Sequence, residues 1–289
     1  MPTTESLPTT LTLGAVHLNV SDLQRSVAWY ERSLGLRVVD QASDRVALGD
    51  GDSAVVELHE RPDARPATEN EASLFHYCLL YPTRAELARA LRRIRTTGTP
   101  VTNMNDRHTH EAVYLNDPDG TNVELAWDRP REQWPETPYG HPPVELDVDG
   151  LLATIANEET LAPSVGEGLR VGHLHFSVGD LDRAISFYRD VLGLDLKYYV
   201  DTSEKYKAGA FFSVGGYHHH MAANLAKGKN VGPLAQDALG VVHWTIELQD
   251  AGDVAAARDR IASAGAAVTD IEGGFIALDP WSIPVHVIS

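Results

Sequence analysis

Histidines inside short apolar runs are the residues of this chain best suited to chemistry. The chain has 13 histidines, and an imidazole can bind a divalent metal or exchange a proton near neutral pH. His76 lies in the run LFHYCLL, while His173 and His175 lie two residues apart in VGHLHF and so share one face of an extended strand. A lone histidine in such a run is more often a core residue, so its position relative to other donors decides between the two interpretations.

Other polar residues fall at spacings that could bring them to the same face. Period-two geometry predicts that His218 and His220, in GYHHHMAAN, point to one side, with Asn224 on that side if no bulge intervenes. Tyr114 precedes Glu124 by an even number of residues, which is compatible with a shared face. A solvated glutamate is the alternative for Glu124, because its neighbours are apolar and point to the opposite face.

An internal repeat predicts the elements that position these side chains. The segment HLNVSDLQRSVAWYERSLGL returns as HFSVGDLDRAISFYRDVLGL, and the offset between equivalent residues is constant throughout. Each copy reads as an alternating strand, an aspartate N-cap, a helix with apolar residues at helical spacing, and a glycine stop. Short β-rich runs with turn residues follow, such as DRVALGDGDSAVVEL and AFFSVGGYHHHMAAN.

A second kind of repeat lies inside each half. The strands around His76 and His243 precede the helical patterns TRAELARALRRIRTTG and DAGDVAAARDRIASAG, and similar turns follow at DPDG and DPWS. The sequence therefore predicts an α+β protein of four βαβββ modules. An N-terminal domain at 1–128 would hold modules 11–60 and 73–128, a C-terminal domain at 170–289 would hold modules 170–225 and 239–289, and the Pro-rich residues 129–169 would link them.

Composition excludes several function classes. The net charge of −17 disfavours nucleic acid as a partner, since binding phosphates needs a basic footprint. No run approaches the length of a membrane span, and the N-terminus does not resemble a signal peptide. The single cysteine, Cys78, excludes an intrachain disulfide and is expected to be an inert buried thiol. These features predict a cytoplasmic protein.

The fourfold pattern of a strand, Asp-Leu, a helix ending in Leu-Gly, and three strands resembles the vicinal-oxygen-chelate superfamily. This superfamily includes glyoxalase I, bleomycin-resistance proteins and extradiol dioxygenases. The segments DPDGTNVE, DRPR and GYHHH resemble those of the Bacillus-type catechol-2,3-dioxygenase branch. The resemblance implies that two modules join into one cupped mixed sheet, with two cups in the chain and a metal inside the active cup.

The resemblance also implies a ligand set of two histidines and one glutamate, which suits Fe(II), with Mn(II) or another divalent metal as alternatives. Joining modules two and three supplies all three ligands. The other pairings lack one ligand or replace the carboxylate by histidine. The expected ligands are therefore His76, Glu124 and His173. His243 and His286 remain alternative metal ligands, or relics in an empty cup.

The implied activity is oxidative opening of a catechol-like aromatic diol by O2, in aromatic catabolism. In this scheme His220, or His218, exchanges a proton with the diol, and Tyr114 orients a substrate oxygen. His175, His108 and Asn224 are expected to contact substrate. Homodimers are common in the superfamily, so a homodimer is a further expectation. The alternatives are a glyoxalase-like metal-dependent isomerase and a metal-free protein that binds a drug or another small molecule.

Overall fold

A computed structural model of the protein describes residues 6–139, 141–202 and 208–289. The chain divides into two compact units. The N-terminal unit is Val20–Pro62 with His76–Gly172. The C-terminal unit consists of the described residues of Met1–Asn19, Asp63–Phe75 and His173–Ser289. The predicted domain limits at 1–128 and 170–289 remain predictions, as does the linker at 129–169; residues 1–5, 140 and 203–207 lie outside the described residues.

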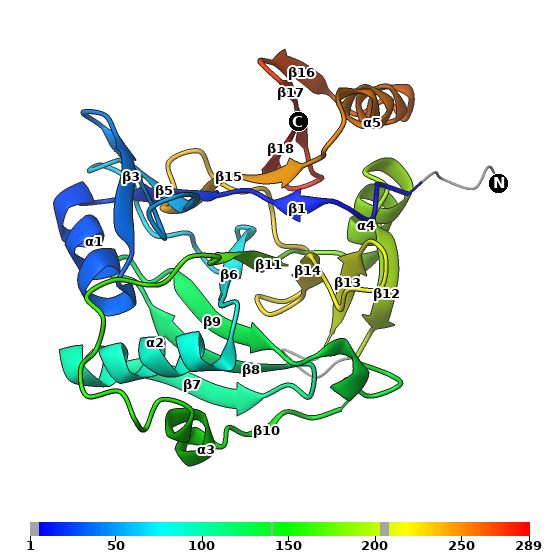
Figure 1. Cartoon of the computed structure of the whole chain (residues 1–289). Helices are drawn as coiled ribbons and strands as arrows, with labels where there is room; N and C mark the ends of the chain where they lie inside the picture. Colours follow the sequence, from blue (N-terminus) through cyan, green and yellow to red (C-terminus); the bar gives the residue numbers. More distant parts are fainter. Residues whose placement is uncertain (1–5, 140, 203–207) are drawn as a thin grey trace. The chain divides into compact units, whose positions relative to one another are not determined.

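The N-terminal unit contains modules one and two apart from their first residues, together with the segment that follows them (Figure 1). Its elements are α1 (Leu23–Trp29), β3 (Arg37–Gln41), β4 (Arg45–Gly49), β5 (Ala54–Glu60), β6 (Ser73–Leu80, which begins in the other unit), α2 (Arg84–Thr97), β7 (Val101–Asp106), β8 (His110–Asn116), β9 (Asn122–Asp128), β10 (Val144–Glu145) and α3 (Val148–Ala153), with a π-helical turn at Tyr30–Leu34 and a 3-10 turn at Arg131–Gln133.

The C-terminal unit contains modules three and four and the first two strands of the chain. Its elements are β1 (Thr12–Leu13), β2 (Val16–Val20, whose last residue belongs to the other unit), β11 (Arg170–Ser177, whose first three residues do), α4 (Leu181–Ile185), β12 (Asp195–Val200), β13 (Gly209–Ser213), β14 (Met221–Asn224), β15 (Gly240–Glu247), α5 (Ala251–Ser263), β16 (Val268–Ile271), β17 (Gly274–Leu278) and β18 (Pro284–Ile288), with a π-helical turn at Ser186–Val191.

The sheets are mixed, and the pairing repeats from module to module. The first and last strands of a module are parallel in β6 with β9, β11 with β14, and β15 with β18, while the strands between them form antiparallel hairpins. A parallel pair needs a crossover, and the module helix supplies it. The predicted α+β fold of βαβββ modules is confirmed.

The predicted helix starts are confirmed by their hydrogen bonds. Asp22 and Asp180 each accept the backbone N–H of the residue three positions later, which satisfies a group that a helix start leaves without a partner. Both helices then widen into π-helical turns before Gly35 and Gly193. Those glycines have φ of 74° and 91°, a left-handed conformation that side chains disfavour.

A buried tyrosine joins the first helix of each unit to the turn of its last module. The Tyr30 hydroxyl lies 3.2 Å from Asp117 Oδ2, and the Tyr188 hydroxyl lies 2.7 Å from Asp279 Oδ2. Burial raises the pKa of both aspartates to about 6. The same contact therefore fixes the packing of the helix in both units.

Strand β2, from module one, pairs antiparallel with β15, from module four, inside the C-terminal unit. Leu18 lies opposite Val241 and His17 opposite His243. This pairing connects the first strands of the two modules that are farthest apart in the sequence. Among the described residues, no helix is both long and apolar enough to cross a membrane.

Candidate functional site

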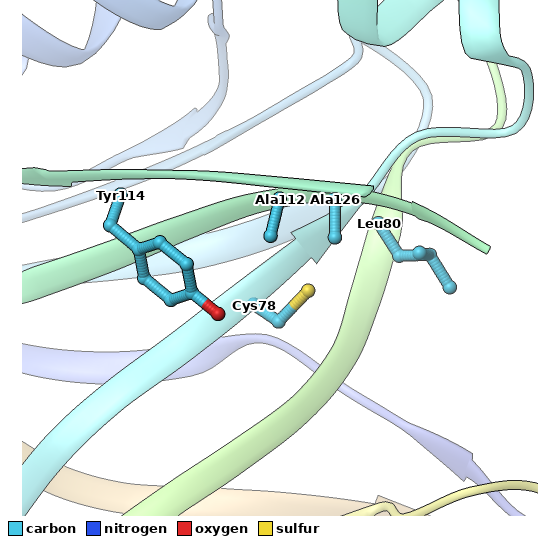
Figure 2. Packing of buried hydrophobic residues seen from close by; sticks show 5 residues of the cluster. All are labelled: Cys78, Leu80, Ala112, Tyr114 and Ala126. Carbon is cyan, nitrogen blue, oxygen red and sulfur yellow. The ribbon is translucent and has the colours of Figure 1, made fainter. Parts of the chain in front are cut away.

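One face of the β6–β9–β8 sheet carries the polar side chains of a candidate site in the N-terminal unit. The register sets Glu124 beside Cys78 on one side and Tyr114 on the other. Figure 2 shows how Cys78 and Tyr114 lie with small and apolar neighbours from the same three strands. The alternate residue Tyr77 turns to the opposite face, where its hydroxyl lies 2.8 Å from that of Tyr30. Strand alternation therefore separates the site from the core beneath α2.

Glu124 is a buried carboxylate between two imidazoles. Its exposed fraction is 1%, its Oε2 lies 3.0 Å from His76 Nε2, and its Oε1 lies 3.1 Å from His110 Nε2. A carboxylate removed from water needs positive or hydrogen-bonding partners. The solvated glutamate, which was the alternative interpretation, is excluded by this burial. Nitrogen and carboxylate donors so placed fit a divalent transition metal.

Tyr114 completes this face. Its ring stands at 70° to that of His76, with centroids 5.7 Å apart. Burial, together with the nearby negative charge of Glu124, raises the pKa of the Tyr114 phenol well above its usual value of 10. Burial is also the main cause of the raised pKa of the Cys78 thiol. The phenol is therefore a hydrogen-bond donor at neutral pH, and the thiol is a poor nucleophile.

The C-terminal unit holds a cluster of four histidines. His219 lies at the centre: its ring centroid is 4.1 Å from that of His173, its Nε2 is 2.8 Å from His175 Nε2, and its Nδ1 is 2.7 Å from His218 Nδ1. Ring nitrogens of His173, His218 and His219 lie within 4.8 Å of one another, and all three side chains are buried. The cluster can offer nitrogen ligands to a metal or exchange protons.

Two residues expected beside this cluster make other contacts. His220 Nδ1 lies 2.9 Å from Ser213 Oγ, and the ring is half-buried. The side-chain carbonyl of Asn224 accepts hydrogen bonds from Ser177 Oγ at 3.1 Å and from Ala226 N at 3.0 Å. The predicted alternation of His218 and His220 does not apply, because β14 begins only at Met221 and the three histidines precede it.

His108 lies in the turn between β7 and β8. Its φ of 68° is unusual for a residue with a side chain, and its Nε2 lies 3.0 Å from the carbonyl of Pro142. The segment after β9 thus rests on this turn. The neighbouring His110 begins β8 and is buried, so it is part of the site.

The alternative metal ligands form a stack. His243 lies between His17 and His286, with ring centroids 3.7 Å and 3.6 Å away. The rings of His243 and His286 are within 8° of parallel. Because imidazole lone pairs lie in the ring plane, parallel rings direct them side by side, and one ring would have to turn before both bound a single ion. Burial lowers the pKa of His286, which favours the neutral form and hence stacking.

Sequence reasoning named His110, with His108, only as a possible substrate contact in a loop. It did not single out His219, which strand alternation placed on the other face from His218, or Arg107, whose Cζ lies 5.9 Å from the centre of the Tyr114 ring. Nothing in the sequence around Arg107 distinguished it from other arginines.

Comparisons with known proteins show the family of this chain. The family model for the glyoxalase/bleomycin resistance protein/dioxygenase superfamily matches residues 12–125 and 170–275. The chain is 33% identical over 276 residues to a catechol-2,3-dioxygenase of Bacillus subtilis (strain 168), covering 93% of this chain and 94% of that protein.

Two solved structures share the fold. A Bacillus subtilis protein provisionally assigned as a dioxygenase superposes with a TM-score of 0.64 at 18% identity, covering 96% of this chain and 85% of the other. Glyoxalase I of Zea mays superposes with a TM-score of 0.59 at 16% identity, covering 97% and 92%.

Proposed function

Since the chain belongs to the glyoxalase/bleomycin resistance protein/dioxygenase superfamily, we propose that it is a non-haem Fe(II) extradiol dioxygenase. It would open a catechol-like aromatic diol by breaking the ring C–C bond beside the two hydroxyls, with both atoms of O2 entering the product. The observation that carries the proposal is the buried Glu124 carboxylate, which has His76 at 3.0 Å and Tyr114 opposite it on the neighbouring strand. The Bacillus subtilis relative named catechol-2,3-dioxygenase supports it.

The proposed metal ligands are His76, Glu124 and His173. The pairing of β2 with β15 joins the first strands of modules one and four, and this is compatible with the choice. Two imidazoles and a carboxylate suit Fe(II) and leave open positions. When bound, the metal would act as a Lewis acid toward the diol and provide a position for O2.

The protein's own groups would bind and orient the diol. The Tyr114 phenol stays protonated because its pKa is raised well above 10, so it can donate a hydrogen bond to a substrate oxygen. A histidine takes the diol proton. His218 and His220 are the proposed candidates, and the proximity of the His218 ring to that of His173, 5.8 Å between centroids, favours His218.

The test begins with protein purified without air and loaded with Fe(II). Catechol is added, then O2, and ring opening is followed by the yellow product and by O2 uptake. We expect one O2 consumed per product. A metal-loaded protein that turns over no diol in a panel of catechols would indicate a different reaction, such as isomerisation. A protein that binds no divalent metal would indicate a small-molecule-binding function.

Glu124→Gln and His286→Gln form a matched pair of variants, because the two residues occupy equivalent positions on β9 and β18. We expect Glu124→Gln to lower iron content and to reduce kcat/KM about 100-fold or more, since a neutral amide is a weak ligand. His286→Gln should stay within about threefold of the wild type. The reverse result would assign the metal to the His243–His286 stack.

A further inference from the structure

Arg107 is presented by a turn that several contacts hold in place. The turn joins β7 to β8, and the Arg107 N–H donates to the His110 carbonyl at 2.8 Å. The next residue, His108, donates its N–H to Asp106 Oδ1 at 2.7 Å and has its ring against Pro142. A left-handed residue persists only where the surroundings determine it. The Arg107 side chain therefore starts from a fixed backbone.

The Arg107 guanidinium reaches the face that carries Tyr114. Its Cζ lies 5.9 Å from the centre of the Tyr114 ring. Desolvation lowers the pKa of Arg107, but its electrostatic interactions with Tyr114 and Glu124 outweigh this and raise the pKa overall. A guanidinium has five N–H donors in a planar fork. Its position places a positive charge beside the phenol that is proposed to contact the diol.

Two other arginines of the same unit bind carboxylates of the protein. Arg84 and Arg129 both bind Glu111, at 2.7 Å and 3.0 Å, and Arg129 also binds Asp106 at 2.6 Å. In the described ranges 6–139, 141–202 and 208–289, no carboxylate lies within ion-pair distance of Arg107. Arg107 is also exposed. In a chain of net charge −17, an arginine beside the site that forms no ion pair among the described residues is suited to an anionic ligand.

We propose that Arg107 binds a carboxylate carried by the substrate, so that the preferred substrate is an aromatic diol with an acidic side chain. The inference rests on the proposed dioxygenase function and narrows its substrate class. A guanidinium binds a carboxylate through two parallel N–H···O bonds, which add orientation as well as affinity. Tyr114 would meet the diol end of the substrate and Arg107 the acidic end.

The experiment compares acidic and neutral substrates of similar size on the Fe(II)-loaded protein. The acidic diols are 3,4-dihydroxybenzoate and 3,4-dihydroxyphenylacetate, and the neutral ones are their methyl esters and catechol. For the wild type we expect a higher kcat/KM for at least one acid than for its ester. Arg107→Gln should lower kcat/KM for that acid about 10- to 100-fold and leave catechol within about threefold. For the same acid, kcat/KM of Arg107→Lys should lie between the values of the wild type and of Arg107→Gln, because a lysine keeps the positive charge but lacks the planar fork of N–H donors.

Arg95→Gln is the matched control, since Arg95 is an exposed arginine at the end of α2. Binding of 3,4-dihydroxyphenylacetate to protein as purified, measured by calorimetry, gives a second readout, and its Kd should rise about 10-fold or more in Arg107→Gln. A wild type that opens catechol but prefers the esters would overturn the inference while keeping the dioxygenase function. Equal losses for acid and catechol in Arg107→Gln would make Arg107 a positioning residue for Tyr114 and overturn it too. Failure of catechol turnover would count against the proposed function itself.

Discussion

Tyr114 and Glu124 face each other across two strands, and this pairing controls the state of the phenol. A tyrosine buried beside a carboxylate resists ionisation, because its anion would be both desolvated and repelled. The pKa of Tyr114 is accordingly raised well above 10. The residue can therefore give a hydrogen bond over the whole range in which the protein is expected to work, and it cannot act as a base there.

Tyr114→Phe tests the proposed hydrogen bond, because it removes only the phenol hydroxyl. We expect kcat/KM for catechol to fall about 10- to 100-fold, since one hydrogen bond to a developing charge is lost. The pH profile of kcat/KM in the variant should have the same shape as in the wild type up to about pH 9.5, because the Tyr114 phenol stays protonated throughout that range. An alkaline limb that disappears in Tyr114→Phe would show instead that the phenol ionises during the reaction.

Residue spacing predicted part of the candidate site. Glu124 and Tyr114 were placed on one face by their even spacing, and the register confirms this. His219 was assigned to the opposite face from His218, because alternation was applied to residues that precede β14 and are not in a strand. Arg107 reaches Tyr114 from the turn before β8, in which the next residue, His108, contacts the carbonyl of Pro142; this placement is not visible in residue spacing.

At the scale of elements, the tyrosine–aspartate contact joins module one to module two and module three to module four, and it makes the stability of each unit depend on pH. Asp117 accepts the backbone N–H groups of Asp119 and Thr121 at 3.0 Å and 2.8 Å, yet burial outweighs these bonds and raises its pKa from 3.8 to about 6. A carboxyl whose pKa is raised on folding contributes most stability when protonated. That contribution is lost as the pH rises through 6.

Asp117→Asn should remove this dependence, since an amide does not titrate. The difference in unfolding free energy, wild type minus Asp117→Asn, should decrease by roughly 1 to 2 kcal/mol when the pH is raised from 5 to 7.5. Urea unfolding at the two pH values measures it. Asp259→Asn is the control, because the Asp259 side chain is 78% exposed. A difference that grows with pH would mean that the buried carboxyl is stabilised as an anion.

The sequence predicted helix and strand types better than their ends. The helices α2 and α5 follow their expected patterns closely, with Thr83 and Asp250 as N-caps. The π-helical turns at Tyr30–Leu34 and Ser186–Val191 were not predicted, because the insertion of a buried tyrosine there depends on the aspartate it must reach. The stretch ELDVDGLLATI, which has a helix-like pattern, carries α3, whose Gly150 carbonyl accepts a hydrogen bond from Arg84 at 3.1 Å.

At the scale of the whole molecule, the two strands that begin the chain belong with its C-terminal unit. β1 and β2 both pair with β15, through Thr12 opposite Glu247 and Leu18 opposite Val241. Val16, Leu18 and Val20 have exposed fractions of at most 1%. A sheet edge that loses such a neighbour exposes unpaired backbone groups and apolar side chains.

A fragment of residues 170–289 should therefore fold poorly by itself. We expect it to bind a hydrophobic dye and to form oligomers in size-exclusion chromatography. Joining residues 6–19 to it through a flexible linker should raise its melting temperature by several degrees, which corresponds to about 1 kcal/mol or more. A matched linker carrying the same residues in scrambled order is the control. Equal melting temperatures for the two fusions would mean that β15 does not depend on β2.

The correspondence between His243–His286 and His76–Glu124 has a consequence for engineering. His286 lies beside Thr245 as Glu124 lies beside Cys78, and the histidine two residues earlier is the same in both strands. The two strand pairs thus present donors at equivalent positions, with a carboxylate at 124 and an imidazole at 286. Installing glutamate at position 286 would give laboratory evolution a second starting point in the same polypeptide, from which a new reactivity could be selected without disturbing the first.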